Sequence, residues 1–152
     1  MFRQRTFKPA DLDRVMDVVH QCIRDTYTPE FFLNVSSLWQ EGFLVTESQS
    51  GIVAFAMGLM PGPQQSRLLL LATLPPYRMK GLGGTLLDGF MENSRKAGAT
   101  SMSLEVRVSN EKARVLQAEG LPAGLEHTSI LQRRRGRPRD VAPIITTHLK
   151  AI

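Results

Sequence analysis

The sequence predicts an α/β fold in which helices flank a mixed, mostly antiparallel central sheet with one parallel junction. Three observations predict it. Strand-like segments form hairpins in the first half of the chain, whereas strands alternate with helices in the second half. Leu68–Leu74 is a nearly unbroken apolar run, as expected of a central strand covered on both faces. A glycine-rich stretch, Arg78–Gly84, joins this run to an amphipathic helix and is called the glycine loop below.

Two helices are expected after a short first strand at Phe2–Phe7. Apolar residues recur at helical spacing from near Pro9 to about Arg24. Proline is tolerated at the start of such a pattern because the first helical N–H groups have no intrahelical partner. The break that follows ends at Thr28, a helix-capping residue, and Pro29 is then the first residue of the second helix.

Three strands are expected after the second helix. The first two, Gly42–Glu47 and Ile52–Met60, are joined by Ser48–Gly51, whose composition is typical of a hairpin turn. A second turn at Pro61–Pro63 leads to the central strand, Leu68–Leu74. Antiparallel pairing is therefore expected through this part of the sheet.

The second half of the chain alternates between helices and strands. The helix after the glycine loop has one apolar face, made of Leu82, Leu86, Leu87, Phe90 and Met91. Ser101–Val108 is the next strand, and Asn110 caps a helix that runs to about Glu119. Leu125–Gln132 and Pro143–Ile152 form a closing strand pair. The strand–helix–strand order predicts a parallel junction near Leu68–Val108.

Length and composition bound the class of protein. The chain has 152 residues, enough for a single domain spanning 1–152, and 42% of them are hydrophobic and 22% charged. No apolar run reaches the roughly 18 residues of a membrane-spanning helix, and no secretory signal is apparent. We therefore expect a cytoplasmic protein with no membrane partner. Cys22 is the single cysteine, which excludes a disulfide framework.

The excess positive charge is concentrated in one segment. The formal net charge is +5, and Arg133–Arg139 contains five arginines, so the rest of the chain is near neutral. Three interpretations stay open, namely a solvated hairpin tip, a recognition site for an acidic partner, and a docking site for RNA or the ribosome. The nucleic-acid interpretation ranks last because no aromatic residues are interleaved with the arginines.

The glycine loop has the composition of an anion-binding turn. Glycine lacks a Cβ atom, so backbone N–H groups can approach a ligand closely. The following helix N-terminus adds unpaired N–H donors, and Arg78 and Lys80 add positive charge. The stretch is neither a P-loop nor a G-x-G-x-x-G fingerprint. Spacing alone therefore leaves a diphosphate site and a simple tight turn equally open.

Three motifs resemble those of one family. Arg78, Gly81 and Gly83 match the Gln/Arg-x-x-Gly-x-Gly/Ala signature of the GNAT acetyltransferase superfamily. Leu104–Asn110 is similar to the L-E-V-R-x-S-N run of bacterial and archaeal ribosomal-protein and protein N-terminal acetyltransferases. Tyr27–Leu33 resembles the Y-P-x-x-F-F stretch of the same enzymes. The motifs occur in the family's order, and the resemblance covers nearly the whole chain.

The resemblance implies acetyl-coenzyme A as the cosubstrate, no metal, and a GNAT-like sheet whose parallel strands splay apart. It assigns backbone groups of Leu71, Ala72 and Thr73 to the pantetheine arm and the thioester oxygen. It assigns the diphosphate to Arg78, Met79, Lys80, Gly81, Leu82, Gly83 and Gly84. Asn110 would hydrogen-bond the pantetheine, although it is a good helix cap in either case.

The resemblance also implies which residues carry the chemistry. Glu105 occupies the place of the glutamate that acts as general base in relatives, and Tyr27 and Phe32 would help to line the acceptor pocket. A base is needed because an α-amino group, with a pKa of about 7.7–8.0, must lose a proton. Gln117 stands where the family has a tyrosine that protonates the departing thiolate, and Ala113–Leu121 is one residue short. An amide can donate a hydrogen bond to sulfur but is not a practical acid.

Simpler interpretations stand beside these assignments. Glu105 could pair with Arg107, and Tyr27 could simply pack its loop. Cys22 lies on an apolar helix face, so we expect a buried structural thiol rather than a nucleophile. The histidines are scattered, and their spacing indicates no metal site: they are His20, His127 and His148.

We therefore predict an acetyl-coenzyme A-dependent N-acetyltransferase that modifies the N-terminal amine of a protein or peptide. A GNAT enzyme for a small amine or a lysine side chain is the first alternative, because loops alone rarely settle the acceptor. The second is a coenzyme A-binding protein with weakened catalysis, which the substitution at Gln117 supports.

Overall fold

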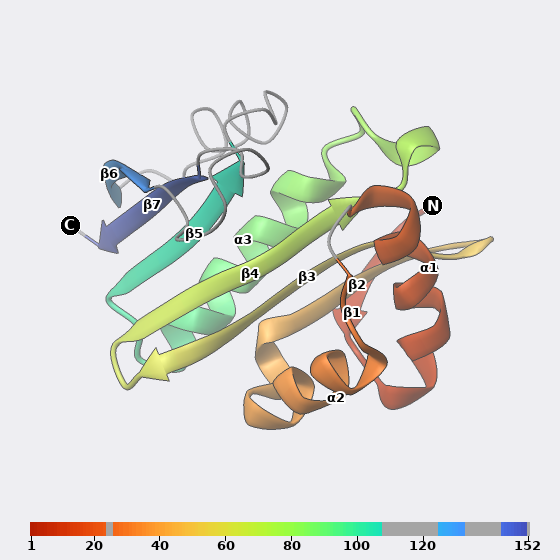
Figure 1. Cartoon of the computed structure of the whole chain (residues 1–152), viewed down its shortest axis with the longest axis horizontal. Coiled ribbons are helices and arrows are strands. Elements are labelled where there is room, and N and C mark those ends of the chain that lie inside the picture. The colour runs from red at the N-terminus through yellow and green to blue at the C-terminus, as the bar shows by residue number, and fades with distance from the viewer. Residues whose placement is uncertain (24–25, 108–124, 133–143, 152) are drawn as a thin grey trace.

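A seven-stranded sheet forms the centre of the described part of the chain (Figure 1). The computed structural model describes residues 1–23, 26–107, 125–132 and 144–151, and from residue 104 onward it describes the backbone alone. The strands are β1 (Arg3–Thr6), β2 (Phe43–Ser48), β3 (Gly51–Gly62), β4 (Gln65–Thr73), β5 (Ser101–Arg107), β6 (Leu125–Gln132) and β7 (Ile144–Ala151). Their order in the sheet is β1-β2-β3-β4-β5-β7-β6. Every neighbouring pair is antiparallel except β4 and β5, which are parallel, so the predicted mixed sheet is confirmed.

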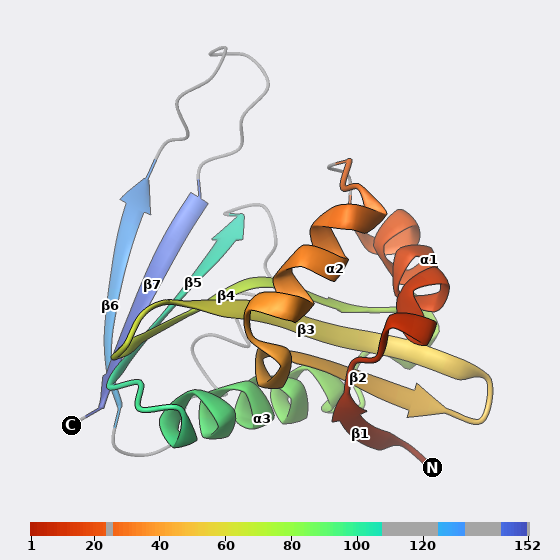
Figure 2. The same cartoon turned by 90° about the horizontal axis from the view of Figure 1, so that it is seen from below.

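Helices cover both faces of the sheet. The elements are η1 (Pro9–Asp11), α1 (Leu12–Cys22), α2 (Pro29–Leu38), η2 (Gln40–Gly42), η3 (Pro75–Tyr77) and α3 (Leu82–Lys96), where η marks a short 3-10 turn. Figure 2 shows α1 and α2 on one face and α3 on the other. The predicted order of elements is confirmed within the described residues, and the helix predicted after Asn110 lies outside them.

The helices begin and bury their faces as their sequences predict. Thr28 caps α2, where its Oγ1 accepts a hydrogen bond from the backbone N–H of Phe31 at 3.3 Å, and Pro29 is the first helical residue. The apolar face of α1 buries Val15, Met16, Val18 and Val19. The apolar face predicted for α3 is also buried, with Ser94 in addition.

The two faces of the sheet enclose separate apolar cores. The core under α1 and α2 is rich in aromatic rings, and Phe7 stacks on Phe43 with ring centroids 4.0 Å apart. Phe32 of α2 meets Phe55 of β3 edge-on at 6.1 Å. Such pairs contribute about 0.5–1.5 kcal/mol each beyond the burial of their surface. The second core lies under α3, whose Phe90 is fully buried there.

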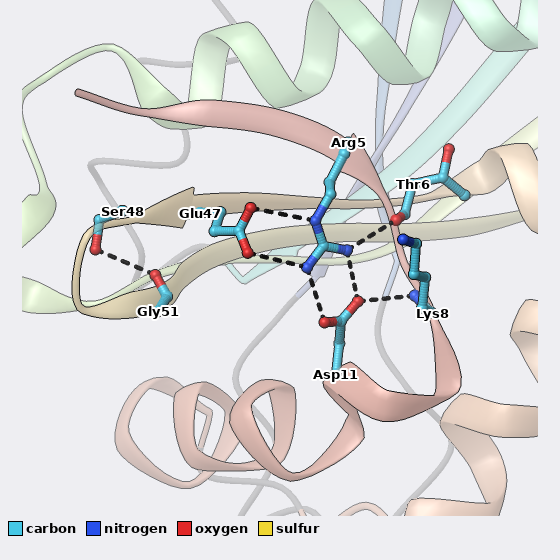
Figure 3. A network of polar contacts seen from close by, with 7 residues as sticks. All are labelled: Arg5, Thr6, Lys8, Asp11, Glu47, Ser48 and Gly51. Carbon is cyan, nitrogen blue, oxygen red and sulfur yellow. Dashed lines mark hydrogen bonds and ion pairs between the residues drawn. The ribbon is translucent and has the colours of Figure 1, made fainter.

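An ion-pair network fastens the N-terminal edge of the sheet (Figure 3). The Arg5 guanidinium donates hydrogen bonds to both carboxylate oxygens of Asp11, at 2.7 and 2.8 Å, and to Glu47 at 3.3 Å. The side chains of Arg5 and Asp11 are only 17% and 12% exposed. The hydrogen bonds from Arg5 hold the pKa of Asp11 and of Glu47 below their ordinary values. The network thereby joins β1, η1 and β2.

Two details of the prediction are wrong. The second turn is not Pro61–Pro63, because β3 continues through Gly62 and the turn consists of Pro63 and Gln64. A shift in the pairing register between Leu59 and Gly62 accommodates Pro61, which has no N–H to donate. The central strand is also not covered on both faces. Leu69–Leu71 are half-buried, and the reason lies in how β4 and β5 separate.

Candidate active site

The parallel pair at the centre of the sheet opens toward one end. β4 and β5 pair from Gln65 and Ser101 to Leu68 and Leu104, and no later pair joins them among the described residues. Both strands nevertheless continue, β4 to Thr73 and β5 to Arg107. Figure 2 shows β5 diverging from β4, with β7 and β6 beside β5. The splayed parallel junction that the resemblance implied is therefore present.

A bulge in β4 coincides with the opening. Consecutive β3 residues Met57 and Gly58 face Leu70 and Leu68, so Leu69 is an extra residue on β4. A bulge bends its strand and increases the local twist, and we attribute the end of the β4–β5 pairing to this bend. The bulge also directs Leu69 and Leu70, although they are consecutive, to the same core.

The part of β4 beyond the bulge is paired on one edge. Leu70–Thr73 stays paired with β3, whereas on the side of β5 it has no ladder partner in the described part of that strand. This segment contains Leu71, Ala72 and Thr73, whose backbone groups were predicted to contact the pantetheine arm. Leu71 and Thr73 are half-buried and Ala72 is buried. The segment therefore combines an unpaired backbone edge with apolar surface.

An aromatic cluster borders the same end of β4. Tyr27 stacks on Phe31 at 5.4 Å and meets Phe32 edge-on at 6.1 Å. Tyr27 and Phe31 are half-buried and pack against the core that Leu69 and Leu70 also border. Phe32 is 0% exposed and so has no surface to offer a ligand. Of the two residues predicted to line the acceptor pocket, Tyr27 is partly exposed, whereas Phe32 is buried and packs against the ring of Tyr27.

The glycine loop contains two residues with left-handed backbone. Met79 has φ 62° and Gly81 has φ 77°. This conformation suits glycine but costs a methionine on the order of 1 kcal/mol. The Met79 side chain is 89% exposed, so its burial does not offset that cost. Strain of this kind is maintained where the shape of a loop matters for a ligand.

The start of α3 presents backbone N–H donors without a capping side chain. Gly81 is the N-cap, and the first helical turn contains no acidic residue. The N–H groups of Leu82, Gly83 and Gly84 have no acceptor within the helix. Arg78 and Lys80 are exposed beside them. Free donors, positive charge and little side-chain bulk are what a diphosphate requires, so these residues fit coenzyme A.

The carbonyl oxygen of Thr73 joins the end of β4 to the glycine loop and to α1. It accepts a hydrogen bond from Arg78 Nε at 2.9 Å and one from Cys22 Sγ at 3.4 Å. Burial raises the pKa of the Cys22 thiol, and Arg78 opposes this in part. Cys22 is half-buried rather than buried, so the expectation of a buried thiol is wrong. Sequence spacing could not reveal the contact between Cys22 and Thr73, because these two residues are 51 positions apart.

Glu105 lies at the point where the strands separate. It is the first residue of β5 beyond the last pair with β4, and on its other side it pairs with Thr146 of β7. Three further predicted sites lie outside the described residues, namely Asn110, Gln117 and the arginine segment Arg133–Arg139.

Two kinds of feature are absent from the described residues. No helix among them is long and apolar enough to cross a membrane. Within the same residues, no group of three or more His, Cys, Asp or Glu side chains is arranged to hold a metal ion.

Comparison with known protein families identifies the family of this chain. Residues 12–117 match the family described as the acetyltransferase (GNAT) family. The chain belongs to this family. The matched range runs from α1 past β5, so it includes the splayed junction and the glycine loop of this GNAT protein. The protein is accordingly an acetyl-coenzyme A-dependent N-acetyltransferase.

Individual relatives of this GNAT chain agree with the assignment. It is 26% identical over 124 residues to an N-alpha-acetyltransferase of Sulfurisphaera tokodaii, covering 74% of each chain. It is 30% identical over 112 residues to an uncharacterized N-acetyltransferase of Methanocaldococcus jannaschii, covering 72% of this chain and 70% of the relative. The crystal structure of Ard1 from Thermoplasma volcanium superposes with a TM-score of 0.85 at 24% identity, covering 99% and 98% of the two chains. The last similarity concerns the fold alone.

Proposed function

We propose that this N-acetyltransferase transfers the acetyl group of acetyl-coenzyme A directly to the α-amino group of a protein or peptide N-terminus. The observation that carries the proposal is the position of Glu105, the first β5 residue beyond the end of the β4–β5 pairing. A carboxylate in this part of the chain would stand beside the opening into which a thioester and an amine must both fit. The similarity to an N-alpha-acetyltransferase supports the choice of acceptor.

In the proposed reaction the cosubstrate binds along the unpaired edge of β4 and the glycine loop. The loop N–H groups, with Arg78 and Lys80, would neutralise the diphosphate charge. Backbone groups of Leu71–Thr73 would hold the pantetheine arm, and an N–H there would stabilise the oxyanion. Acetyl-coenzyme A supplies an activated acyl group, so the proposed transfer requires neither a metal nor a covalent enzyme intermediate.

The acceptor would approach from the α1 and α2 side. Tyr27, Phe31, Leu69 and Leu70 form a half-buried apolar border at that side of β4. Such a border can pack against the first residues of a peptide and exclude water from the amine. This surface favours a peptide over a small polar amine as the acceptor.

Glu105 is the proposed general base. It would take a proton from the ammonium group, directly or through a water, so that the neutral amine attacks the carbonyl carbon. The C–N bond forms, the C–S bond breaks, and coenzyme A leaves as a thiolate, while the nitrogen gives up its second proton to water as the amide forms. A thiol pKa near 8.5 makes this thiolate a tolerable leaving group, so Gln117 needs to donate only a hydrogen bond to sulfur.

A peptide library tests the acceptor. The protein is incubated with acetyl-coenzyme A and peptides that carry free N-termini and internal lysines, and the products are read by mass spectrometry. We expect acetyl groups on N-termini, with a preference for certain first residues. Acetylated lysines or small amines would overturn the choice of acceptor. Cofactor binding without transfer to any acceptor would instead indicate a coenzyme A-binding protein.

Substitution of the proposed base tests the mechanism. Glu105→Gln should lower kcat by about 100-fold or more, because it removes the proton acceptor and little else. The dissociation constant for acetyl-coenzyme A, measured by calorimetry, should change less than twofold. Glu41→Gln, at an exposed glutamate in η2, is the matched control and should leave both values unchanged. Equal losses of turnover and of cofactor affinity in Glu105→Gln would remove Glu105 from the role of base.

A further inference from the structure

The N-terminus of the chain touches the segment that leads into the glycine loop. The ring of Phe2 meets the ring of Tyr77 edge-to-face, with centroids 6.1 Å apart and an interplanar angle of 87°. Tyr77 ends η3 and directly precedes Arg78, the first residue of the glycine loop. Figure 1 shows the N-terminus beside the segment that links β4 to α3. Phe2 and Tyr77, which are far apart in the chain, are thus in contact next to the proposed cofactor site.

Phe2 directly precedes the first strand of the sheet. Terminal residues usually fray unless they are tied down. Here the next residue, Arg3, pairs with Glu47 of β2, so the backbone beside Phe2 belongs to the sheet. Phe2 is 39% exposed, so its ring lies at the surface and is covered in part. Its ring is therefore in a position to support the ring of Tyr77.

The other side of the contact is a stiff unit. Pro75 and Pro76 fix their own φ angles, and the N–H of Tyr77 donates to the carbonyl of Leu74 at 2.9 Å. The ring of Tyr77 therefore moves together with the backbone that enters the glycine loop. Two residues later Met79 adopts its left-handed conformation with an exposed side chain, so its own packing cannot hold the loop in shape.

We propose that Phe2 is a positioning residue for cosubstrate binding: it supports Tyr77 and thereby keeps Arg78–Gly84 in the form that holds the diphosphate. The inference rests on the proposed cofactor role of the glycine loop. It makes the second residue of the chain a determinant of acetyl-coenzyme A affinity. We expect Phe2 to act on binding and not on the chemical step, because its ring meets Tyr77 of η3, directly before the loop that would hold the diphosphate.

The test is the dissociation constant for coenzyme A, measured by calorimetry on the 152-residue chain without an added tag. Phe2→Ala should weaken binding about threefold to tenfold, as expected for the loss of one aromatic pair. Phe2→Tyr should bind within twofold of the wild type, since it keeps the ring. Leu38→Ala is the matched control, because Leu38 is an exposed apolar residue of α2, 74% exposed. Thermal unfolding of each variant without ligand checks that the fold is kept.

A kinetic readout and a double variant separate positioning from a general loss of structure. KM for acetyl-coenzyme A should rise in Phe2→Ala while kcat at saturating cosubstrate stays within twofold. Tyr77→Ala should have an effect similar to that of Phe2→Ala, and the double variant should be no worse than Tyr77→Ala, because both remove one contact. Additive effects, or a Phe2→Ala affinity equal to that of the wild type, would overturn the proposal.

A reference variant shows whether a negative result concerns the role of Phe2 or the cofactor role of the glycine loop. Gly81→Val places a branched side chain on a left-handed backbone and should abolish tight coenzyme A binding if the glycine loop holds the diphosphate. Loss in Gly81→Val with no effect in Phe2→Ala refutes the role of Phe2 alone. Unchanged binding in Gly81→Val refutes the cofactor role of the loop, and the inference about Phe2 with it.

Discussion

The N-terminal edge of the sheet and the open end of β4 satisfy their polar groups in opposite ways. At the edge, the carboxylates of Asp11 and Glu47 both accept hydrogen bonds from Arg5, so the charged groups are already paired. At the open end, the backbone of β4 beyond Leu69 has no ladder partner toward β5 among the described residues, and no side chain caps the first turn of α3. The first region therefore contributes stability, and the second offers binding groups. Changes in the two regions should accordingly have separate effects.

Among the substitutions that compare these two regions, Arg78→Ala in the open region should have the largest effect. Arg78→Ala removes both the Nε hydrogen bond to the Thr73 carbonyl and a positive charge beside the glycine loop. We expect the dissociation constant for acetyl-coenzyme A to rise about 10- to 100-fold, because hydrogen bonds of charged groups contribute about 1.5–3 kcal/mol. Calorimetry measures this value. Arg95→Ala, at an exposed arginine near the end of α3, is the control and should bind normally.

The next effect concerns the stability of the fold and should leave the affinity for acetyl-coenzyme A unchanged. Asp11→Asn should lower the free energy of unfolding by about 2 kcal/mol, because it leaves the mostly buried Arg5 without its nearest anion. Urea unfolding at pH 7 measures the loss. The affinity for acetyl-coenzyme A should stay within twofold. A large loss of affinity would mean that the two regions are coupled more strongly than their contacts indicate.

The pH dependence of the same variant gives a second check. Arg5 lowers the pKa of Asp11 in the folded state, so the ionised carboxylate stabilises the fold. Because the pKa of Asp11 is lower in the folded state, this stabilisation is complete at pH values above the pKa of the unfolded state, about 3.9. It is lost as the pH falls through the pKa of the folded state. The difference in stability between the wild type and Asp11→Asn should therefore be constant from pH 7 to about pH 5 and shrink below about pH 4. A difference that grew on acidification would contradict the assigned ion pair.

The smallest effect tests whether the left-handed residue in the glycine loop is maintained for binding. Met79→Val should weaken acetyl-coenzyme A binding a few-fold and destabilise the fold by about 1 kcal/mol, because a β-branched residue disfavours this conformation most. Met79→Gly should bind as well as the wild type, since glycine adopts the conformation freely. Equal affinities of the Val and Gly variants would show that the backbone at this position is irrelevant to the cosubstrate.

Local elements were predictable because their causes are local. Thr28 and Pro29 define the start of α2, and the periodic leucines of α3 define its buried face. The glycine loop was recognisable because its composition and its place between a strand and a helix are both local. The turn after β3 was misplaced by a residue or two, since Pro61 can be carried within a strand when the register shifts.

The bulge at Leu69 was hidden by its surroundings. Alternation of apolar and polar residues normally reveals which face of a sheet each side chain takes. Leu68–Leu71 are all leucine, so no alternation exists from which a bulge could be inferred. The half-buried state of Leu69–Leu71 follows from that bulge, and the prediction of a fully covered strand was wrong for this reason.

The sequence by itself determined the kinds of elements, the glycine loop, the family resemblance and the residue types available for chemistry. These depend on spacing within a few positions or on motifs whose order is preserved along the chain. Only the tertiary structure decided that β4 bends away from β5 at Leu69, that Glu105 directly follows their last pair, and that Cys22 and Arg78 share the Thr73 carbonyl. It also brought Phe2 to Tyr77. The physical reason is that such contacts join residues far apart in the chain, and their geometry is set by how strands twist and helices pack.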